Sequence, residues 1–522
     1  MTTVTSPPGT TSGDGLAGDL AAVPRELWIG GVWRPASDGR RIDVEDPSTG
    51  SRIADVADAT VQDGLAAVAA ADAALPAWAA VAPRVRAEVL RRAFELMTER
   101  SEQLARLVVR ENGKALPDAR GEVAYAAEFF RWYAEEAVRA GGELHTAPAG
   151  TNRILVLRQP IGVCVLVTPW NFPAAMATRK IGPALAAGCT VILKPASLTP
   201  LTALAIAAIL AEAGVPDGVV NVLPSSRSGA VVSAMLHDPR VRKLSFTGST
   251  QVGRQLLREA ADCVVNSSME LGGNAPFLVF DDADLEAAVA GAIVAKMRNG
   301  GEACTAANRF YVQRGIADDF TERFAAAMAG LRMGPGLDSS VQLGPLVDEP
   351  SRSKVVELVA DAVGRGARVV TGGALPLGDG WFYPPTVLGA VQPGSAVLTE
   401  EIFGPVAPIV VFDTEDEAVA MANDTEYGLV SYVYTADLAR GLRVGEAMAS
   451  GMVGLNRALV SDPAAPFGGV KQSGLGREGG HDGLLEYLES KYIAVQWSRS
   501  GRRSRTLQCG RSRAGDGVAL RA

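Results

Sequence analysis

The chain has 522 residues, too many for one hydrophobic core, so two or three domains are expected. Hydrophobic residues make up 48% and charged residues 21%, which is the balance of a soluble globular protein and excludes a largely disordered or membrane-embedded chain. With 50 Lys and Arg against 58 Asp and Glu, the net charge of -8 offers no general basic footprint, so nucleic acid is not expected as a partner.

The two ends of the chain carry no recognisable targeting signal. Residues 1–25 lack both a basic start and an apolar segment, which predicts a disordered leader rather than an export signal. The best apolar helical stretch, residues 201–214, is too short to span a bilayer, so we expect no membrane partner and a cytoplasmic location. The basic, aperiodic tail of residues 498–522 is predicted to be disordered.

Helical and strand-like patterns then follow in order. From about residue 66 to residue 107, Ala and Leu recur at helical spacing among Arg and Glu, which predicts long amphipathic helices. From residue 161 to residue 270, apolar strand-like runs alternate with helical ones, which predicts an α/β fold with a parallel sheet covered on both faces. The predicted strands are residues 161–167, 190–195, 218–224, 241–247 and 263–270.

Three short motifs stand where predicted strands end. They are PWNFP at residues 169–173, KPAS at residues 194–197 and FTGST at residues 246–250. Because parallel sheets bind ligands beyond the carboxyl ends of their strands, we expect these motifs to share one crevice. The alternative is that each is simply a turn rich in Pro, Gly and Ser.

A second α/β unit is predicted to begin at residue 274. Its first helix, residues 282–298, opens with capping acids and stops at Asn299, Gly300 and Gly301. Cys304 therefore falls in a loop between a helix and a strand. A cysteine that begins a new helical turn there would meet free backbone N–H groups that favour the thiolate, so Cys304 is a candidate nucleophile.

The other cysteines and the histidines give no comparable signal. Five cysteines occur without a Cys-x-x-Cys pair and three histidines lie far apart, so neither a disulfide framework nor a metal site is expected. Cys164 and Cys189 lie in or beside apolar runs and are interpreted as small core residues, while Cys263 and Cys509 have no supporting context.

Six short motifs of the chain are MELGGNAP, GGEAC, PWNFP, FTGST, EEIFGP and PFGGVKQSGLGRE. Taken together in their order and spacing, they resemble the aldehyde dehydrogenase superfamily over roughly residues 27–496. The resemblance implies a Rossmann-type cofactor domain, an α/β catalytic domain and a small oligomerisation arm that makes a homodimer or homotetramer. The implied boundaries are residues 26–144 and 163–271 for the cofactor domain, 272–480 for the catalytic domain, and 145–162 and 486–497 for the arm.

The resemblance also implies a chemistry. Cys304 attacks an aldehyde carbon, and the Asn171 amide with the Cys304 N–H stabilises the oxyanion. Loss of hydride to a nicotinamide leaves a thioester, which water hydrolyses with Glu270 as general base once burial has raised its pKa. Glu270 could instead be a surface carboxylate at a strand end, and Glu478 is a second candidate for proton transfer.

Two positions beside Cys304 depart from the usual family motif. Glu302 stands where relatives usually carry glutamine, and a negative charge there would raise the thiol pKa if the side chain pointed inward. Position 306 is alanine where many relatives have a second cysteine, so a local disulfide switch at that spacing is impossible.

For the cofactor, the resemblance implies NADP as the preferred nucleotide with NAD as the alternative. Serine at position 197 replaces a family glutamate that would repel a 2′-phosphate. The implied cofactor-binding residues are Trp170, Lys194, Ser197, Gly248, Ser249, Leu271, Glu401 and Phe403.

For the substrate, Arg179, Arg298 and Ser461 match positions that bind the remote carboxylate in succinate-semialdehyde dehydrogenases. The leading hypothesis is therefore oxidation of succinate semialdehyde, a small-molecule aldehyde. Alternatively the two arginines are structural, and Asp462 beside Ser461 would repel a carboxylate if it faced the pocket. The rival functions are a dehydrogenase for another semialdehyde or a neutral aldehyde, a catalytically retired binding or structural protein, and a thiol hydrolase without cofactor.

Overall fold

The computed structural model describes residues 20 and 22–496. Within them the chain divides into two compact units, residues 20, 22–140 and 159–489 in the first and residues 141–158 and 490–496 in the second. Most of the expected leader, the expected tail and Cys509 lie outside the described residues. Both large sheets belong to the first unit, and the predicted boundary between a cofactor and a catalytic domain stays a prediction.

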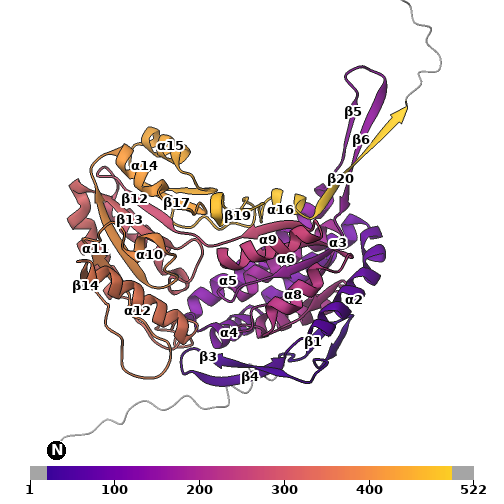
Figure 1. The fold of residues 1–522 in the computed structure, drawn as a ribbon, viewed down its shortest axis with the longest axis horizontal. Helices are drawn as coiled ribbons and strands as arrows, with labels where there is room; N and C mark the ends of the chain where they lie inside the picture. Colours follow the sequence, from indigo (N-terminus) through magenta and orange to yellow (C-terminus); the bar gives the residue numbers. More distant parts are fainter. Residues whose placement is uncertain (1–19, 21, 497–522) are drawn as a thin grey trace, which may run out of the picture. The chain divides into compact units, whose positions relative to one another are not determined.

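The first large sheet has eight strands in the order β19-β11-β10-β7-β8-β9-β1-β2 (Figure 1). The five central strands are parallel and correspond to the five strands predicted from the sequence. The strand order reverses between β7 and β10, which is the switch point where doubly wound sheets bind ligands. The bounds are β1 Leu27–Ile29, β2 Val32–Arg34, β7 Val163–Val167, β8 Thr190–Lys194, β9 Val220–Val222, β10 Val241–Thr247, β11 Asn266–Glu270 and β19 Gly474–Leu475.

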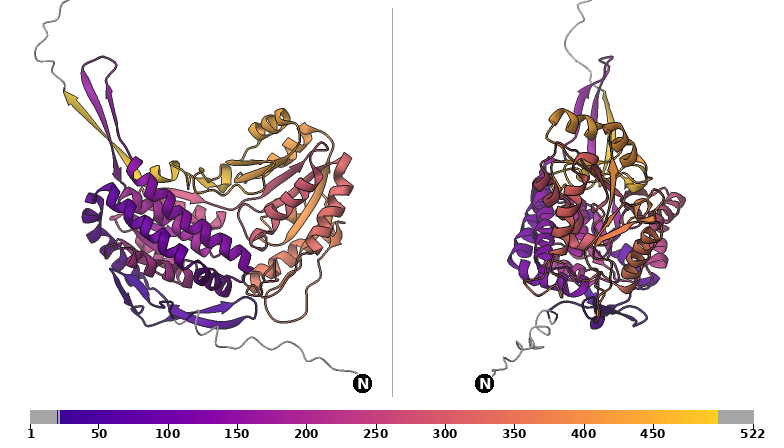
Figure 2. Two further views of the ribbon diagram at one scale, coloured as in Figure 1. Left: turned by 180° about the vertical axis from the view of Figure 1, so that it is seen from behind. Right: turned by 90° about the vertical axis from the view of Figure 1, so that its left-hand side faces the viewer.

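Helices cover both faces of this sheet, as the continuous apolar strands required. On one face α3 packs on α5 and α5 on α6, and the views of Figure 2 show the long helices of residues 83–136 as an outer layer. The helices are α2 Val61–Ala80, α3 Pro83–Glu99, α4 Ser101–Asn112, α5 Leu116–Glu136, α6 Pro173–Ala187, α7 Leu201–Glu212, α8 Ser228–Leu236, α9 Thr250–Asp262 and α16 Asp482–Leu485. A small hairpin of β3 Arg41–Asp46 and β4 Ser51–Ala57 follows β2 in the chain.

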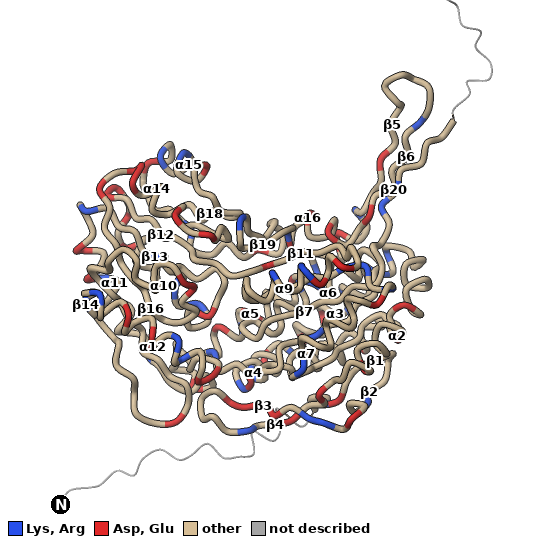
Figure 3. Tube along the Cα trace, viewed as in Figure 1, with Lys and Arg blue, Asp and Glu red and all other residues tan. Residues whose placement is uncertain are grey.

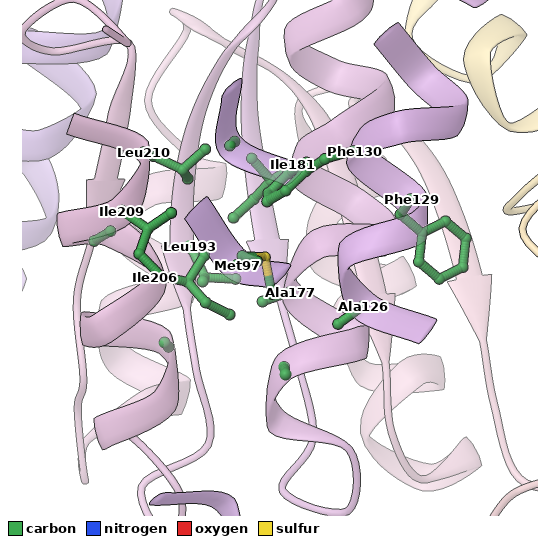
Figure 4. Packing of buried hydrophobic residues seen from close by; sticks show 14 of the residues in the cluster. Met97, Ala126, Phe129, Phe130, Ala177, Ile181, Leu193, Ile206, Ile209 and Leu210 are labelled. Atoms are coloured by element: carbon green, nitrogen blue, oxygen red, sulfur yellow. The ribbon is translucent and has the colours of Figure 1, made fainter. Parts of the chain in front are cut away.

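A large apolar core joins these helices to the sheet. Figure 4 shows Ile181 of α6, Leu193 of β8 and Ile206 of α7 converging on one interior region. All three side chains are fully buried, and Phe129 and Phe130 of α5 are fully buried in the same cluster. This packing fixes α6, whose first residue is the last proline of the PWNFP motif, against β7 and β8.

The second large sheet has seven strands in the order β14-β15-β16-β13-β12-β17-β18, all parallel except for the antiparallel pair β14 and β15. Its strands are β12 Ala275–Val279, β13 Ala307–Gln313, β14 Arg368–Thr371, β15 Thr386–Gly389, β16 Val406–Phe412, β17 Val430–Tyr434 and β18 Met452–Leu455. Its helices are α10 Leu285–Met297, α11 Ala317–Ala329, α12 Glu349–Gly364, α13 Ala396–Thr399, α14 Glu415–Asn423 and α15 Leu438–Ala447. The predicted strand at residue 274 and the helix after it are confirmed.

The second unit is a three-stranded sheet in the order β20-β6-β5. Its strands are β5 Glu143–Thr146, β6 Asn152–Pro160 and β20 Leu488–Gln496. All of β5 and nearly all of β20 are solvent-exposed, including Leu144, Tyr492 and Ile493. A sheet this small with exposed apolar side chains buries little core of its own.

Charges of both signs are interspersed along the described trace, with no long stretch of one sign (Figure 3). Within residues 20 and 22–496, no single helix is long and apolar enough to cross a membrane. Helices α2 and α3 meet that test of length and composition only as a pair, and they are bent by 116°.

Candidate active site

The loop that carries Cys304 connects α10 to β13. It leaves α10 through Asn299 and Gly300, whose φ angles of 54° and 63° are left-handed, and closes in a turn in which Ala306 N–H donates to the Ala303 carbonyl at 2.9 Å. No helix begins at Cys304, so the expectation of a new helical turn is wrong.

A glycine of the LGG motif allows this loop to approach the first sheet. A Cβ atom added to Gly273 would lie 2.5 Å from the Cys304 carbonyl oxygen, closer than van der Waals contact allows. The motif therefore places its second glycine directly against the backbone of the candidate nucleophile.

The thiol of Cys304 is a weak acid in this environment. Its pKa is raised to about 12, chiefly by desolvation; the guanidinium groups of Arg179 and Arg298 oppose this rise, and the Glu401 and Glu270 carboxyls add to it. The expectation that the loop favours a thiolate is therefore wrong, because the thiol is protonated near pH 7. A base must take its proton before the sulfur can attack.

Glu302 does not add to this effect. Its side chain is buried, its Oε1 accepts the Val347 N–H at 3.1 Å, and burial raises its pKa well above the usual range. The hydrogen bond from Val347 and the charge of Lys114 lower this pKa, and Asp348 raises it. A neutral Glu302 carboxyl that accepts a hydrogen bond from Val347 has no negative charge, so it does not raise the pKa of the Cys304 thiol.

Asn171 is held beside the Cys304 loop by both its main chain and its side chain. Its Nδ2 donates to the Glu302 carbonyl at 2.9 Å, and its own carbonyl accepts from Lys114 Nζ at 2.7 Å and from Asn299 Nδ2 at 2.9 Å. Because Nδ2 carries two hydrogens, one is left for a developing oxyanion. Among the described residues the Cys304 N–H also has no acceptor, so two donors are available at the sulfur.

Glu270, the last residue of β11, is a buried carboxyl rather than a surface one. It is 3% exposed, and neither oxygen has a hydrogen-bond partner among the described residues. Burial and the nearby Glu478 raise its pKa well above the usual range, against the positive charges of Arg179, Lys180 and Arg477. A carboxylate with a raised pKa is a better proton acceptor, which suits a general base.

A cavity of about 250 Å³ joins the two candidate catalytic residues Cys304 and Asn171 to most of the predicted cofactor residues. Ser249 caps the N-terminus of α9, where free N–H groups favour a phosphate. The Glu401 carboxyl accepts the Gly273 N–H at 3.0 Å, and burial raises its pKa to about 7. The cavity is lined by Trp170, Asn171, Gly248, Ser249, Leu271, Cys304, Glu401 and Phe403, among others.

Lys194 and Ser197 are not in this lining. Lys194 ends β8 with its side chain buried, and no hydrogen bond to its Nζ is present among the described residues. Burial alone lowers its pKa to about 8. A buried amine without an acceptor fits a ribose hydroxyl or phosphate oxygen, and the small Ser197 lies three residues beyond it.

A second cavity, of about 430 Å³, is lined by the predicted substrate residues Arg298 and Ser461 together with Tyr125 and Phe172. Arg298 Nη1 donates to Ser461 Oγ at 3.1 Å, and the guanidinium lies 4.9 Å from the centre of the Phe172 ring. Asp462 is solvent-exposed and accepts the Ala464 N–H at 2.9 Å, so it caps its own loop instead of facing the cavity.

Arg179 is placed differently from Arg298. Its guanidinium is 1% exposed, forms an ion pair with Glu478 and lies 4.4 Å from the centre of the Phe467 ring. Lys180 pairs with the same carboxyl, and burial of Glu478 is outweighed by these two cations, which lower its pKa. Arg179 therefore acts on Cys304 through its charge, while part of that charge is neutralised by Glu478.

Several residues of the site gave no sequence signal. Ser351 and Lys354, at the start of α12, line the first cavity, and Lys354 Nζ donates to the Glu401 carbonyl at 2.6 Å. Lys114 and Asn299 hold Asn171 although they lie far from it in the chain; Lys114 gave no signal, and Asn299 was predicted only as a helix stop. Within the described residues no group of three or more His, Cys, Asp or Glu side chains could hold a metal ion.

Residues 33–493 match the aldehyde dehydrogenase family. The chain is 56% identical to succinate-semialdehyde dehydrogenase of Paenarthrobacter nicotinovorans over 443 residues, which are 85% of this chain and 98% of that protein. It is 50% identical over 471 residues to the succinate-semialdehyde dehydrogenase [NADP(+)] of Escherichia coli, covering 90% of this chain and 98% of that one.

A solved structure of succinate-semialdehyde dehydrogenase from Burkholderia pseudomallei superposes with a TM-score of 0.90 at 46% identity. The superposition covers 94% of this chain and 100% of the Burkholderia chain. The chain therefore belongs to the aldehyde dehydrogenase family.

The neutral state of Glu302 has a measurable consequence for stability. Because the folded state raises this pKa, its contribution is complete below the unfolded value of about 4.3 and is lost as pH rises through the folded value. Glu302→Gln needs no proton and keeps the acceptor for Val347. We expect the stability of this variant, relative to that of the unsubstituted chain, to increase as the pH rises above about 5, by about 1.4 kcal/mol per pH unit until the folded pKa is passed, and its relative melting temperature to rise with it.

The matched control is Glu349→Gln, which removes an exposed carboxylate on α12. Its melting temperature should run parallel to that of the unsubstituted chain over the same pH range. Parallel curves for Glu302→Gln as well would show that Glu302 is charged in the folded protein.

Proposed function

We propose that this protein oxidises succinate semialdehyde to succinate with NADP as the preferred cofactor and NAD as the alternative. The observation that carries this proposal is a half-buried thiol, Cys304, in one cavity with the amide of Asn171 and most of the predicted nucleotide contacts, within electrostatic reach of Arg298. The printed names of the relatives, one of them NADP(+)-dependent, support the same substrate and cofactor.

The first step is attack by Cys304 on the aldehyde carbon. Because the free thiol is protonated, its proton passes to a base as the carbon–sulfur bond forms. The charges of Glu401 and Glu270 both act on that sulfur, and Glu270, whose two oxygens have no hydrogen-bond partner among the described residues, is assigned as the base. The carbonyl oxygen becomes an oxyanion, which accepts from the free hydrogen of Asn171 Nδ2 and from the Cys304 N–H. Removing one such donor typically costs about 100-fold to 1,000-fold in kcat.

The nicotinamide cofactor, when bound, supplies the acceptor for the aldehyde hydrogen and its electron pair. Trp170, Leu271, Glu401 and Phe403 would hold its nicotinamide end, and Gly248 and Ser249 its phosphates. The donor set fits such a group, because the first turn of α9 and the unpaired Lys194 offer donors to anionic oxygens.

The remaining steps belong to the chain and to water. The thioester carbonyl uses the same two donors, and Glu270, after it has released the thiol proton to solvent, takes a proton from the attacking water. Collapse then breaks the carbon–sulfur bond, releases the carboxylate and returns a proton to the sulfur. The alternatives of a retired protein and of a cofactor-free hydrolase account for neither the complete set of Cys304, Glu270 and Asn171 nor the nucleotide cavity.

The remote carboxylate of the substrate is assigned to Arg298 and Ser461. Arg298 donates a hydrogen bond to the neutral hydroxyl of Ser461, whereas Arg179 forms an ion pair with Glu478. The positive charge of Arg298 is therefore available to bind the carboxylate of a substrate. A longer semialdehyde could use the same pair, because the cavity of about 430 Å³ does not limit chain length tightly. That substrate is the closest rival.

The exposed three-stranded sheet favours a homodimer or homotetramer, since its apolar side chains gain a covering partner on association. The number of subunits and the cytoplasmic location stay predictions.

The direct test is a panel of aldehydes crossed with both cofactors. Succinate semialdehyde, the semialdehyde one carbon longer and butanal are each assayed with NADP and NAD by the absorbance of the reduced nicotinamide. We expect the highest kcat/KM for succinate semialdehyde with NADP and no turnover by Cys304→Ala. Equal kcat/KM for butanal, or turnover by the alanine variant, would contradict the proposal.

The role of Arg298 is tested by Arg298→Ala. Loss of a charge-assisted contact, worth about 1.5–3 kcal/mol, should raise KM for succinate semialdehyde by about 10-fold to 150-fold and leave KM for butanal nearly unchanged. Arg179→Ala should instead lower kcat for succinate semialdehyde and for butanal alike. This substitution removes the ion-pair partner of Glu478 and a positive charge near Cys304.

Arg323→Ala, which removes an exposed arginine of α11, is the control and should change neither constant. An equal rise of KM on both aldehydes in Arg298→Ala would reject this residue as the carboxylate anchor.

A further inference from the structure

Asn299 is the second of the two residues between α10 and the glycines of the Cys304 loop, and its backbone has a left-handed φ of 54°. Asparagine is several-fold enriched in this region among non-glycine residues. The side chain is only 2% exposed, and the structure does not place it in the lining of either cavity described above. Asn299 therefore lines neither the cavity of Cys304 nor that of Arg298.

Its amide joins the two loops that form the oxyanion site. Asn299 Nδ2 donates to the Asn171 carbonyl at 2.9 Å and to the Glu302 carbonyl at 3.0 Å. The first carbonyl belongs to the loop after β7, and the second to the loop before β13. Asn171 Nδ2 donates to the same Glu302 carbonyl, so the three residues form one closed set of hydrogen bonds.

The orientation of the Asn299 amide is determined by chemistry. In the opposite orientation Oδ1 would face the Asn171 and Glu302 carbonyl oxygens. These three oxygen atoms are all acceptors, so no hydrogen bond could form between them. The backbone is fixed as well, because the Asn299 N–H donates to Asp118 Oδ2 at 2.9 Å and its carbonyl accepts the Glu302 N–H at 2.9 Å. Both hydrogens of Nδ2 are thus committed to the two loops.

We propose that Asn299 is a positioning residue that sets the separation between the Asn171 amide and Cys304 by bonding to the backbone of both loops. The proposal rests on the function proposed above. Oxyanion stabilisation requires donors at about 2.7–3.1 Å from the developing charge, so a small separation of the loops weakens both donors in the transition state. Binding of aldehyde and cofactor uses other residues and should be little affected.

The test compares Asn299→Gly with Asn456→Gly. Asn456 also has a left-handed φ, 49°, and its Nδ2 also donates to a backbone carbonyl, that of Thr435 at 2.9 Å, but it follows β18 outside the site. Glycine keeps the left-handed backbone in both variants, so each loses only the amide. We expect Asn299→Gly to lower kcat by about 10-fold to 100-fold with both KM values within about 3-fold, and Asn456→Gly to change none of them.

A double-mutant cycle separates positioning from general damage. If Asn299 acts through Asn171, adding Asn299→Gly to Asn171→Ala should lower kcat by less than about 2-fold further. Multiplicative losses, or equal effects of the two glycine variants, would overturn the proposal. Similar melting temperatures of the two glycine variants exclude unfolding as the cause.

Amide hydrogen exchange provides a readout that needs no aldehyde reaction. Peptides covering residues 169–173 and 299–306 should both exchange faster in Asn299→Gly and remain unchanged in Asn456→Gly. An unsubstituted chain that oxidises no aldehyde refutes the proposed function alone, and the exchange data still decide the proposal. Unchanged exchange in both peptides refutes the positioning role.

Discussion

The site depends on the close approach of two loops that come from different sheets. One follows β7 and carries Asn171, and the other precedes β13 and carries Cys304. They are joined by Asn299, which bonds to carbonyls on both sides, and glycine at position 273, between β11 and β12, leaves room for the Cys304 backbone beside them. Fully buried helices such as α6 anchor the first loop to a large core, so the approach is held by rigid elements rather than by the loops alone.

The electrostatics of the site follow from its burial. The pKa values of the acids Glu270, Glu302 and Glu401 are all raised, and so is the pKa of the Cys304 thiol. Arg179 and Lys180 share the charge of Glu478, which is the carboxyl whose pKa is lowered. In the free site burial therefore disfavours charge on the sulfur and on these three acids, while Arg179, Lys180 and Glu478 form a charged cluster nearby.

Much of the architecture could be predicted because it depends on local patterns. The five parallel strands, the helix after residue 282 and the loop position of Cys304 all follow from apolar runs and glycine stops. The environment of the sulfur could not be predicted, since burial reverses the effect expected from backbone N–H groups. Ser351, Lys354 and Lys114 were missed because their contacts arise from packing between distant segments, and the pairing of Arg179 with Glu478 arises in the same way.

The central claim is that the thiol of Cys304 is protonated in the free protein and is ionised only as the reaction begins. The most direct measurement is the pH dependence of its alkylation by iodoacetamide, followed on the Cys304 peptide by mass spectrometry without aldehyde or cofactor. A thiol with a pKa of about 12 predicts a rate that still rises tenfold per pH unit up to about pH 10. A rate that levels off below pH 8 would contradict the account.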